Sequence, residues 1–222
     1  MYSMDDVRKW KAVYRLLNQV ETEVYDCGTL CGSACCSCGK GDGEDPAELG
    51  IYLFPGEHLL LQEICQKEIC RPENRMENRM ENLMWESTQE MPGTEELQLE
   101  EESRRVPDRY QLNDWLEWST QDPAELGFPE SWTEPVYFLN CRTAPSCPRH
   151  LRPLQCRTFP LKPVIGENGV LEMIWNDEEL PYKCPIIEQN LPIHDDFYKA
   201  TYTVWTHLIR DPRIFDLVMS WS

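Results

Sequence analysis

Cysteine is the residue type with the clearest chemical potential in this chain, which holds 11 cysteines in 222 residues. Five of them fall within the glycine-rich stretch DCGTLCGSACCSCGKG, namely Cys27, Cys31, Cys35, Cys36 and Cys38. An isolated cysteine commonly packs as a small hydrophobic residue, which suits Cys65 and Cys70. Five thiols so close together, in a stretch without hydrophobic periodicity, indicate instead a loop that surrounds a metal or redox centre.

A second group of thiols lies far downstream. Cys141, Cys147 and Cys156 fall within LNCRTAPSCPRHLRPLQCRTFPL, and Cys184 follows in YKCPII. Two distant groups joined by folded chain favour a site in which separate segments bind one centre. Soft thiolates prefer zinc, iron or iron–sulfur clusters to calcium and magnesium. The odd number of cysteines argues against a fully paired disulfide scaffold.

The adjacent Cys35 and Cys36 limit the geometry of such a site. Consecutive side chains in a loop point in different directions, so the pair is poorly suited to bind one tetrahedral zinc ion together. Either one thiol packs in the interior, or the pair serves two centres or a multinuclear cluster. The spacing Cys35-x-x-Cys38 also matches a zinc-knuckle pair. His150, within the second group, is a further candidate ligand, although a lone histidine more often forms ordinary hydrogen bonds.

The combined pattern resembles a known family. Cys31-x3-Cys35-Cys36, then Cys141-x5-Cys147 and the run RPLQCRTFP at 152–160, is similar to the YkgJ-type family of cysteine-cluster, zinc- or iron-chelating proteins. The resemblance covers 27–38 and 136–190. It implies a bound zinc, iron or iron–sulfur centre held by thiolates. The implied ligands are Cys27, Cys31, Cys35, Cys36, Cys141, Cys147, Cys156 and Cys184.

The resemblance also bears on activity. Some members of the family are labelled iron–sulfur oxidoreductases and others flagellin lysine methylases. We therefore expect a metal-binding protein that coordinates iron, as an iron–sulfur cluster, or zinc, with a redox role as an iron–sulfur oxidoreductase. The alternatives are a structural zinc-binding module that holds a protein-interaction surface and, less favoured, a protein-methylating enzyme. This chain departs from the family pattern in its three-and-three spacing before the Cys pair and in the additional thiol of Cys38.

Two arginines near Cys156 are candidate cofactor-binding residues. Several thiolates on one metal dication leave net negative charge, which the guanidinium groups of Arg152 and Arg157 would stabilise. The alternative is that both arginines pair with surface glutamates. Pro153 and Pro160 restrict the backbone around them, which would hold the thiol in place.

Periodic apolar residues predict the elements that position these groups. The expected elements are helices over 5–26, 57–71, 195–210 and from the Asp211-Pro212 cap to Trp221, a strand over 135–140, and a hairpin of strands 161–165 and 170–175. The sequence DPAELG, at 45–50 and 122–127, predicts one helical turn closed by glycine in each copy. The predicted fold class is α+β: a small metal-organised domain with N- and C-terminal helices, a short β-hairpin and long Cys-rich loops.

An acidic tract interrupts the folded pattern. Residues 73–102 contain ten Glu and two Arg, and like charges recur four residues apart, which weakens a helix. We predict that 1–71 and 107–222 form a single domain and that 72–106 is an acidic insertion or linker. The spacing of Met76, Met80 and Met84 permits a helix that docks on a protein partner, but a solvated segment is favoured.

The overall charge narrows the function classes. The chain has 21 Lys and Arg against 39 Asp and Glu, a formal net charge of −18. Binding of nucleic acid without sequence preference requires a basic face, so we expect no nucleic-acid partner. No stretch approaches the roughly 20 apolar residues that span a bilayer, and we expect no membrane partner. Residues 1–10 lack the apolar run of a secretory signal, which predicts a cytoplasmic protein.

Overall fold

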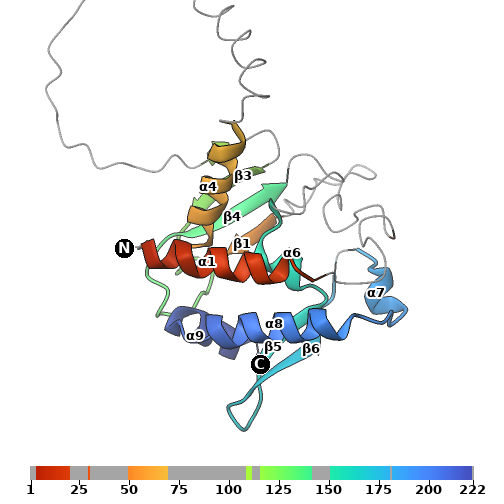
Figure 1. Cartoon of the computed structure of the whole chain (residues 1–222). Coiled ribbons are helices and arrows are strands. Elements are labelled where there is room, and N and C mark those ends of the chain that lie inside the picture. The colour runs from red at the N-terminus through yellow and green to blue at the C-terminus, as the bar shows by residue number, and fades with distance from the viewer. Residues whose placement is uncertain are drawn as a thin grey trace, which may run out of the picture.

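The computed structural model describes residues 4–20, 30, 50–69, 109–111, 116–141, 151–180 and 182–221. These residues form a mixed arrangement of helices and two small antiparallel sheets, so the predicted α+β class is confirmed (Figure 1). The helices are α1 (Met4–Leu17), α4 (Glu57–Ile69), α6 (Leu154–Thr158), α7 (Pro185–Glu188), α8 (Asp195–Leu208) and α9 (Pro212–Ser220). The strands are β1 (Gly50–Leu53), β2 (Arg109–Gln111), β3 (Leu116–Gln121), β4 (Val136–Cys141), β5 (Leu161–Ile165) and β6 (Leu171–Trp175). Across the described ranges, no helix combines the length and apolar character needed to cross a membrane.

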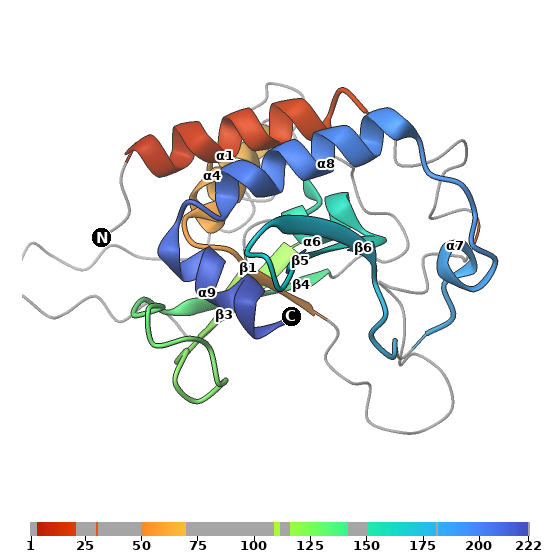
Figure 2. The same ribbon diagram turned by 90° about the horizontal axis from the view of Figure 1, so that it is seen from below.

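Helices α1 and α8 lie side by side and run in opposite directions (Figures 1 and 2). Each presents one apolar face to the core, as the spacing of its apolar residues predicts. The buried side chains are Trp10, Val13, Tyr14 and Leu17 from α1, and Phe197, Ala200, Val204, Trp205 and Leu208 from α8. Helix α1 begins as expected but ends at Leu17, before the predicted end at 26. The turn tightens there, since the Gln19 amide donates to the Leu16 carbonyl over 3.1 Å.

The larger sheet has the strand order β1-β4-β3-β2. Strand β4 confirms the strand predicted over 135–140, and it pairs with β1 on one side and β3 on the other. At one end of the sheet, Gly50 pairs with Asn140. A Cβ atom on Gly50 would lie 2.5 Å from the Phe138 ring, so a side chain at this position would displace that ring. Strands β1, β2 and β3 were not among the predicted elements.

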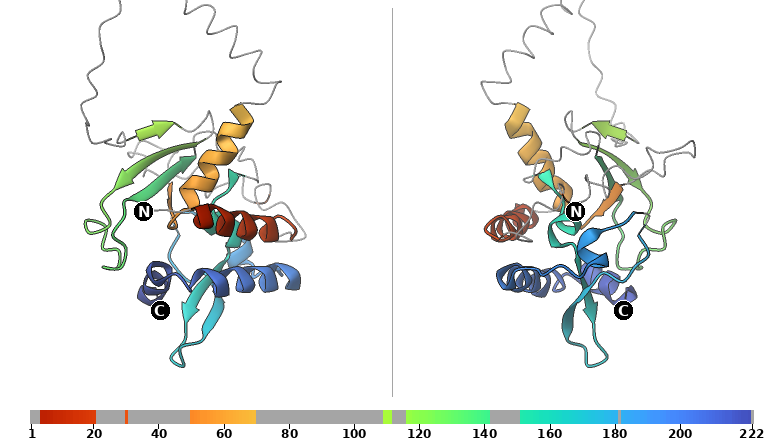
Figure 3. Two further views of the ribbon diagram at one scale, coloured as in Figure 1. Left: turned by 60° about the vertical axis from the view of Figure 1, so that its left-hand side comes forward. Right: turned by 90° about the vertical axis from the view of Figure 1, so that its right-hand side faces the viewer.

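The second sheet is the predicted hairpin of β5 and β6, which is confirmed with nearly the expected bounds. Its turn closes through the Gly166 amide, which donates to the Val170 carbonyl over 2.9 Å. Helices α8 and α9 pack against this hairpin, which extends away from the four-stranded sheet (Figure 3). The predicted helix from Asp211-Pro212 is also confirmed as α9, and the Asp211 carboxylate caps it by accepting from the Arg213 amide.

The second DPAELG copy forms hydrogen-bonded turns rather than a helix. The Asp122 carboxylate accepts from the Ala124 amide over 2.9 Å, and the Leu126 amide donates to the Pro123 carbonyl over 3.2 Å. Gly127 closes the turn with φ of +71°, the conformation expected of a terminating glycine. The first copy lies outside the described residues except for Gly50, and the acidic segment 72–106 lies wholly outside them.

Candidate metal centre

Three of the eight predicted thiolate ligands lie within the described residues. Cys141 is the last residue of β4, Cys156 is half-buried in the short helix α6, and Cys184 is buried at the N-cap of α7. The other five predicted ligands lie outside the described residues: Cys27, Cys31, Cys35, Cys36 and Cys147. Cys38, Cys70 and His150 also lie outside them.

Cys65 has a different environment from these ligands. Its side chain is 1% exposed and belongs to the main hydrophobic core, together with Leu60 and Leu61 of the same helix. The interpretation of Cys65 as a small packing residue is therefore confirmed.

Helix α6, which carries Cys156, is held by a buried carboxylate. Glu57, the first residue of α4, is 0% exposed. Its Oε1 accepts from the Tyr14 hydroxyl over 2.7 Å and from the Leu154 amide at the start of α6 over 2.6 Å. Its Oε2 accepts from the Phe54 amide over 3.0 Å. One side chain thus joins α1, α4, α6 and the segment after β1.

Arg157 forms the second link between α1 and α6. Its Nη1 donates to the Asn18 Oδ1 over 2.6 Å, and its Nε donates to the Arg152 carbonyl over 2.5 Å. The guanidinium carbon lies 4.1 Å from the centroid of the Tyr14 ring, a cation–π contact. Arg157 is only 6% exposed, so its charge acts in the protein interior. Arg152 is half-buried, and its carbonyl belongs to the same arrangement.

Burial dominates the electrostatics of this cluster. It raises the pKa of Glu57, although the three donors and the Arg157 charge oppose that change. It also raises the pKa of Tyr14 well above its ordinary value, and the Glu57 carboxylate adds to the effect. A smaller upward contribution to the Tyr14 pKa comes from Cys156, which places this thiol within electrostatic range of the cluster.

The first cysteine group lies in a segment whose two ends are both attached beside the second group. Before it, Asn18 accepts from Arg157, the residue that follows Cys156. After it, Gly50 pairs with Asn140, the residue that precedes Cys141. The chain that carries the first five thiols therefore leaves and re-enters the described fold next to the chain that carries Cys141 and Cys156.

Cys156 and Cys184 offer soft sulfur donors of the type that a thiolate centre uses. Within the described ranges themselves, no three His, Cys, Asp or Glu side chains gather closely enough to hold a metal ion. Comparisons with protein-family models, with curated proteins and with solved structures found no match to this chain.

Sequence reasoning missed the Glu57 cluster. The predicted helix over 57–71 contains this residue at its first position, where a glutamate is ordinarily explained as a favourable charge at a helix N-terminus. Its burial depends on Tyr14 and Leu154, which are distant in sequence. No local sequence signal marks this cluster, because the partners of Glu57 and the burial of Arg157 appear only in the fold.

Proposed function

We propose that this protein binds iron, as an iron–sulfur cluster, through thiolates from its two cysteine groups, with zinc as the alternative metal. The proposed ligands are Cys27, Cys31, Cys35, Cys36, Cys141, Cys147, Cys156 and Cys184. Thiolates are the ligands that iron–sulfur clusters use most. A bound cluster would supply one-electron transfer, so the proposed role is that of an iron–sulfur oxidoreductase. The resemblance of the cysteine pattern to the YkgJ-type family also supports this proposal.

One observation carries the proposal. Both ends of the segment with the first cysteine group are attached next to residues that adjoin Cys156 and Cys141, through Asn18 and Gly50 respectively. Attachment at both ends lowers the entropic cost of bringing the segment between them to the second cysteine group, compared with a segment attached at one end only. This attachment supports a shared centre for the two groups.

The two arginines have separate roles in this proposal. Arg157 holds α6 against α1 through its contacts with Asn18 and Tyr14, and so fixes the backbone that carries Cys156. Its buried positive charge and that of the half-buried Arg152 would also offset the negative charge of a thiolate centre. Both arginines therefore remain proposed cofactor-binding residues, with Arg157 as the positioning residue.

Metal analysis of the full chain tests this proposal. The protein would be purified without oxygen, and its iron, acid-labile sulfide and zinc would be measured together with its visible spectrum. Iron with equivalent sulfide and broad visible absorption that bleaches on reduction supports the cluster. Colourless protein with stoichiometric zinc supports the structural zinc module instead. Protein that contains neither metal, even after anaerobic reconstitution with iron and sulfide, contradicts both.

A further inference from the structure

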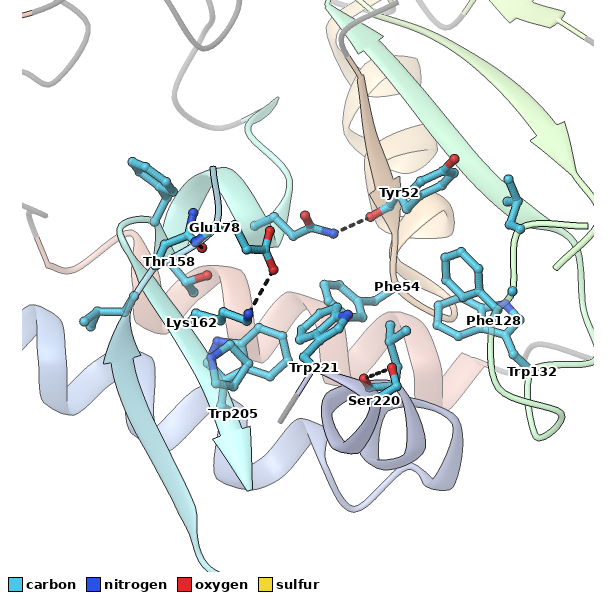
Figure 4. A pocket seen from close by; sticks show the side chains of 18 residues that line it. Tyr52, Phe54, Phe128, Trp132, Thr158, Lys162, Glu178, Trp205, Ser220 and Trp221 are labelled. Carbon is cyan, nitrogen blue, oxygen red and sulfur yellow. Dashed lines mark hydrogen bonds and ion pairs between the residues drawn. The ribbon is translucent and has the colours of Figure 1, made fainter. Parts of the chain in front are cut away.

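A cavity of about 390 Å³ lies where the end of β1, the loop after β3, α6 and the C-terminal helices meet (Figure 4). Its volume falls in the range of small-molecule sites, about 300–1,000 Å³. None of the eight predicted thiolate ligands is among the described residues that line it. The cavity is therefore a separate feature, although α6 contributes Gln155 and Thr158 to its wall and also carries Cys156.

Aromatic side chains make up much of the cavity wall. They form two contacting groups: Tyr52, Phe128 and Trp132 in one, and Phe54, Trp205 and Trp221 in the other. Ring centroids are 5.4 and 4.8 Å apart along the first group and 5.3 and 6.5 Å apart along the second. Figure 4 shows both groups around the same space. Phe54, Trp132 and Trp205 are only 1–3% exposed, whereas Tyr52, Phe128 and Trp221 are half-buried. The half-buried rings therefore offer the surface on which a flat aromatic molecule can stack.

Polar groups occur at the same cavity. Lys162 and Glu178 form an ion pair with a distance of 2.9 Å between Nζ and Oε1, and Asp177 lies 3.6 Å from the same Nζ. The Gln155 amide nitrogen donates to the Tyr52 carbonyl over 2.9 Å, which leaves the amide oxygen able to accept a hydrogen bond. Two carboxylates thus surround one ammonium group, so the cavity has no excess positive charge to attract a phosphate or a carboxylate.

The walls also contain donors. The indole N–H groups of Trp132 and Trp205 are buried and have no hydrogen-bond partner within the described part of the chain. An indole N–H can only donate. A buried donor without an acceptor carries a free-energy cost that an acceptor on a bound molecule can reduce after a small shift of the ring. The Lys162 ammonium group and the Gln155 amide oxygen therefore offer a donor and an acceptor beside the aromatic groups, and the two buried indoles add donors that a small ring shift could expose.

We propose that this cavity binds an uncharged, planar heteroaromatic molecule of two or three fused rings that carries both hydrogen-bond donors and acceptors on its edge. The half-buried rings of Tyr52, Phe128 and Trp221 stack on its faces. The Gln155 oxygen and the Lys162–Glu178 pair bond its edge. The absence of excess positive charge among the described lining residues selects against anionic ligands. This binding does not depend on the metal proposed above.

Lumichrome is a suitable probe because it is uncharged, has three fused rings and carries an imide edge with donors and acceptors. Increasing amounts of the protein would be added to a trace amount of lumichrome, and the quenching of the lumichrome fluorescence would be recorded. We expect saturable binding with a Kd of about 100 µM or lower. Trp221→Leu and Phe128→Leu should each raise that Kd about tenfold, since each removes one stacking face. Trp175→Leu is the matched control, because Trp175 is half-buried in β6 and does not line the cavity.

Two results would overturn the inference. One is the absence of saturable lumichrome binding to wild-type protein, or an equal Kd for wild type, Trp221→Leu and Phe128→Leu. The other concerns the ligand class: anthracene-2-carboxylate has three fused rings with an anionic edge, and we expect it to bind at least about tenfold more weakly. Equal or tighter binding of that anion would contradict the proposed class. Thermal unfolding of each variant would show that the compared proteins are folded.

Discussion

Glu57 is a carboxylate that the fold buries completely and surrounds with donors. Its two oxygens accept from Tyr14, Leu154 and Phe54, which come from three separate segments. A buried polar group stabilises the fold only while its partners remain, because each partner has also lost its hydration. The contribution of Glu57 is therefore to specify how α1, α6 and the end of β1 meet around it.

Replacing the Glu57 carboxylate should destabilise the fold. We expect Glu57→Gln to lower the free energy of unfolding by about 2–3 kcal/mol, because an amide nitrogen now faces at least one backbone donor. Tyr14→Phe should cost about 1–2 kcal/mol through the lost hydroxyl. Urea unfolding monitored by circular dichroism measures both changes.

Glu63→Gln is the matched control for the Glu57 substitution. Glu63 is on the same helix but pairs at the surface with Lys11 and Lys67. We expect it to change the free energy of unfolding by less than about 0.5 kcal/mol. Equal effects at the two glutamates would show that the buried cluster has no special role.

His58, next to Glu57, predicts a pH dependence of stability. Burial lowers its pKa from 6.5 to about 4, although Glu134 and Asp6 oppose this shift. Its ring is 4% exposed and stacks on Tyr137 with centroids 3.9 Å apart. Between pH 6.5 and 4 the unfolded chain binds a proton at this residue and the folded chain does not, so stability falls as pH falls.

The difference between wild type and a variant isolates this effect. Between pH 7 and pH 5, His58 should remove about 2 kcal/mol from the free energy of unfolding. His58→Phe keeps an aromatic ring against Tyr137. Between pH 7 and pH 5, its free energy of unfolding should fall by about 2 kcal/mol less than that of wild type. Urea titrations at the two pH values test this. The same pH dependence in both proteins would mean that His58 binds its proton equally in the folded and the unfolded chain, so that folding does not lower its pKa.

Among the secondary-structure elements, the contact between α1 and α6 matters most for the candidate site. Arg157 forms it by donating to Asn18 and by lying over the Tyr14 ring. Lysine cannot reproduce a planar group that both stacks and donates in fixed directions. We expect Arg157→Lys to lower the free energy of unfolding by about 1–3 kcal/mol and Asn18→Ala by about 1 kcal/mol.

A double-mutant cycle distinguishes this contact from general destabilisation. The double variant should be less destabilised than the sum of the single effects by about 1 kcal/mol, because the two side chains share one hydrogen bond. Arg210→Lys, at an exposed position after α8, serves as the control and should have little effect. Additive effects of Arg157→Lys and Asn18→Ala would contradict the proposed link.

Local sequence signals predicted the elements that depend on local structure. Helix α9 follows its Asp-Pro cap, the hairpin follows its Gly-Glu-Asn-Gly turn, and α4 and α8 follow their apolar periodicity. Strands β1 and β3 were missed because each pairs with β4 across a long stretch of sequence, and no short turn announces the pairing. The apolar spacing predicted that the first helix continues to residue 26, but the helix ends at Leu17. Val20 follows that end and still packs against the core, so the apolar pattern outlasts the helix.

The candidate site was also only partly predictable from the sequence. The cysteine types and spacings were readable from the sequence, and so was the preference for soft metals. The attachments that place the two groups near each other were not, because they depend on Asn18 meeting Arg157 and on Gly50 meeting Asn140. The aromatic cavity could not be predicted from the sequence either, since its walls come from six separate parts of the chain.

At the scale of the whole molecule, the fold holds both ends of the first cysteine segment against the chain that carries Cys141 and Cys156. Metal binding by such an arrangement would add to folding free energy, because the ligands converge only in the folded state. The central claim is that one inorganic centre joins the two cysteine groups. A ligand from either group should then be needed to retain it.

Metal content per chain in three variants tests this claim most directly. After anaerobic purification, Cys36→Ser and Cys156→Ser should each lose most of the bound metal and unfold at a lower temperature than wild type. Cys65→Ala, which replaces a thiol in the hydrophobic core, should keep the full metal content even if it loses stability. Full metal content and unchanged melting in Cys36→Ser or in Cys156→Ser would show that the ligand assignment is wrong, and full metal content in both would contradict a centre shared by the two groups.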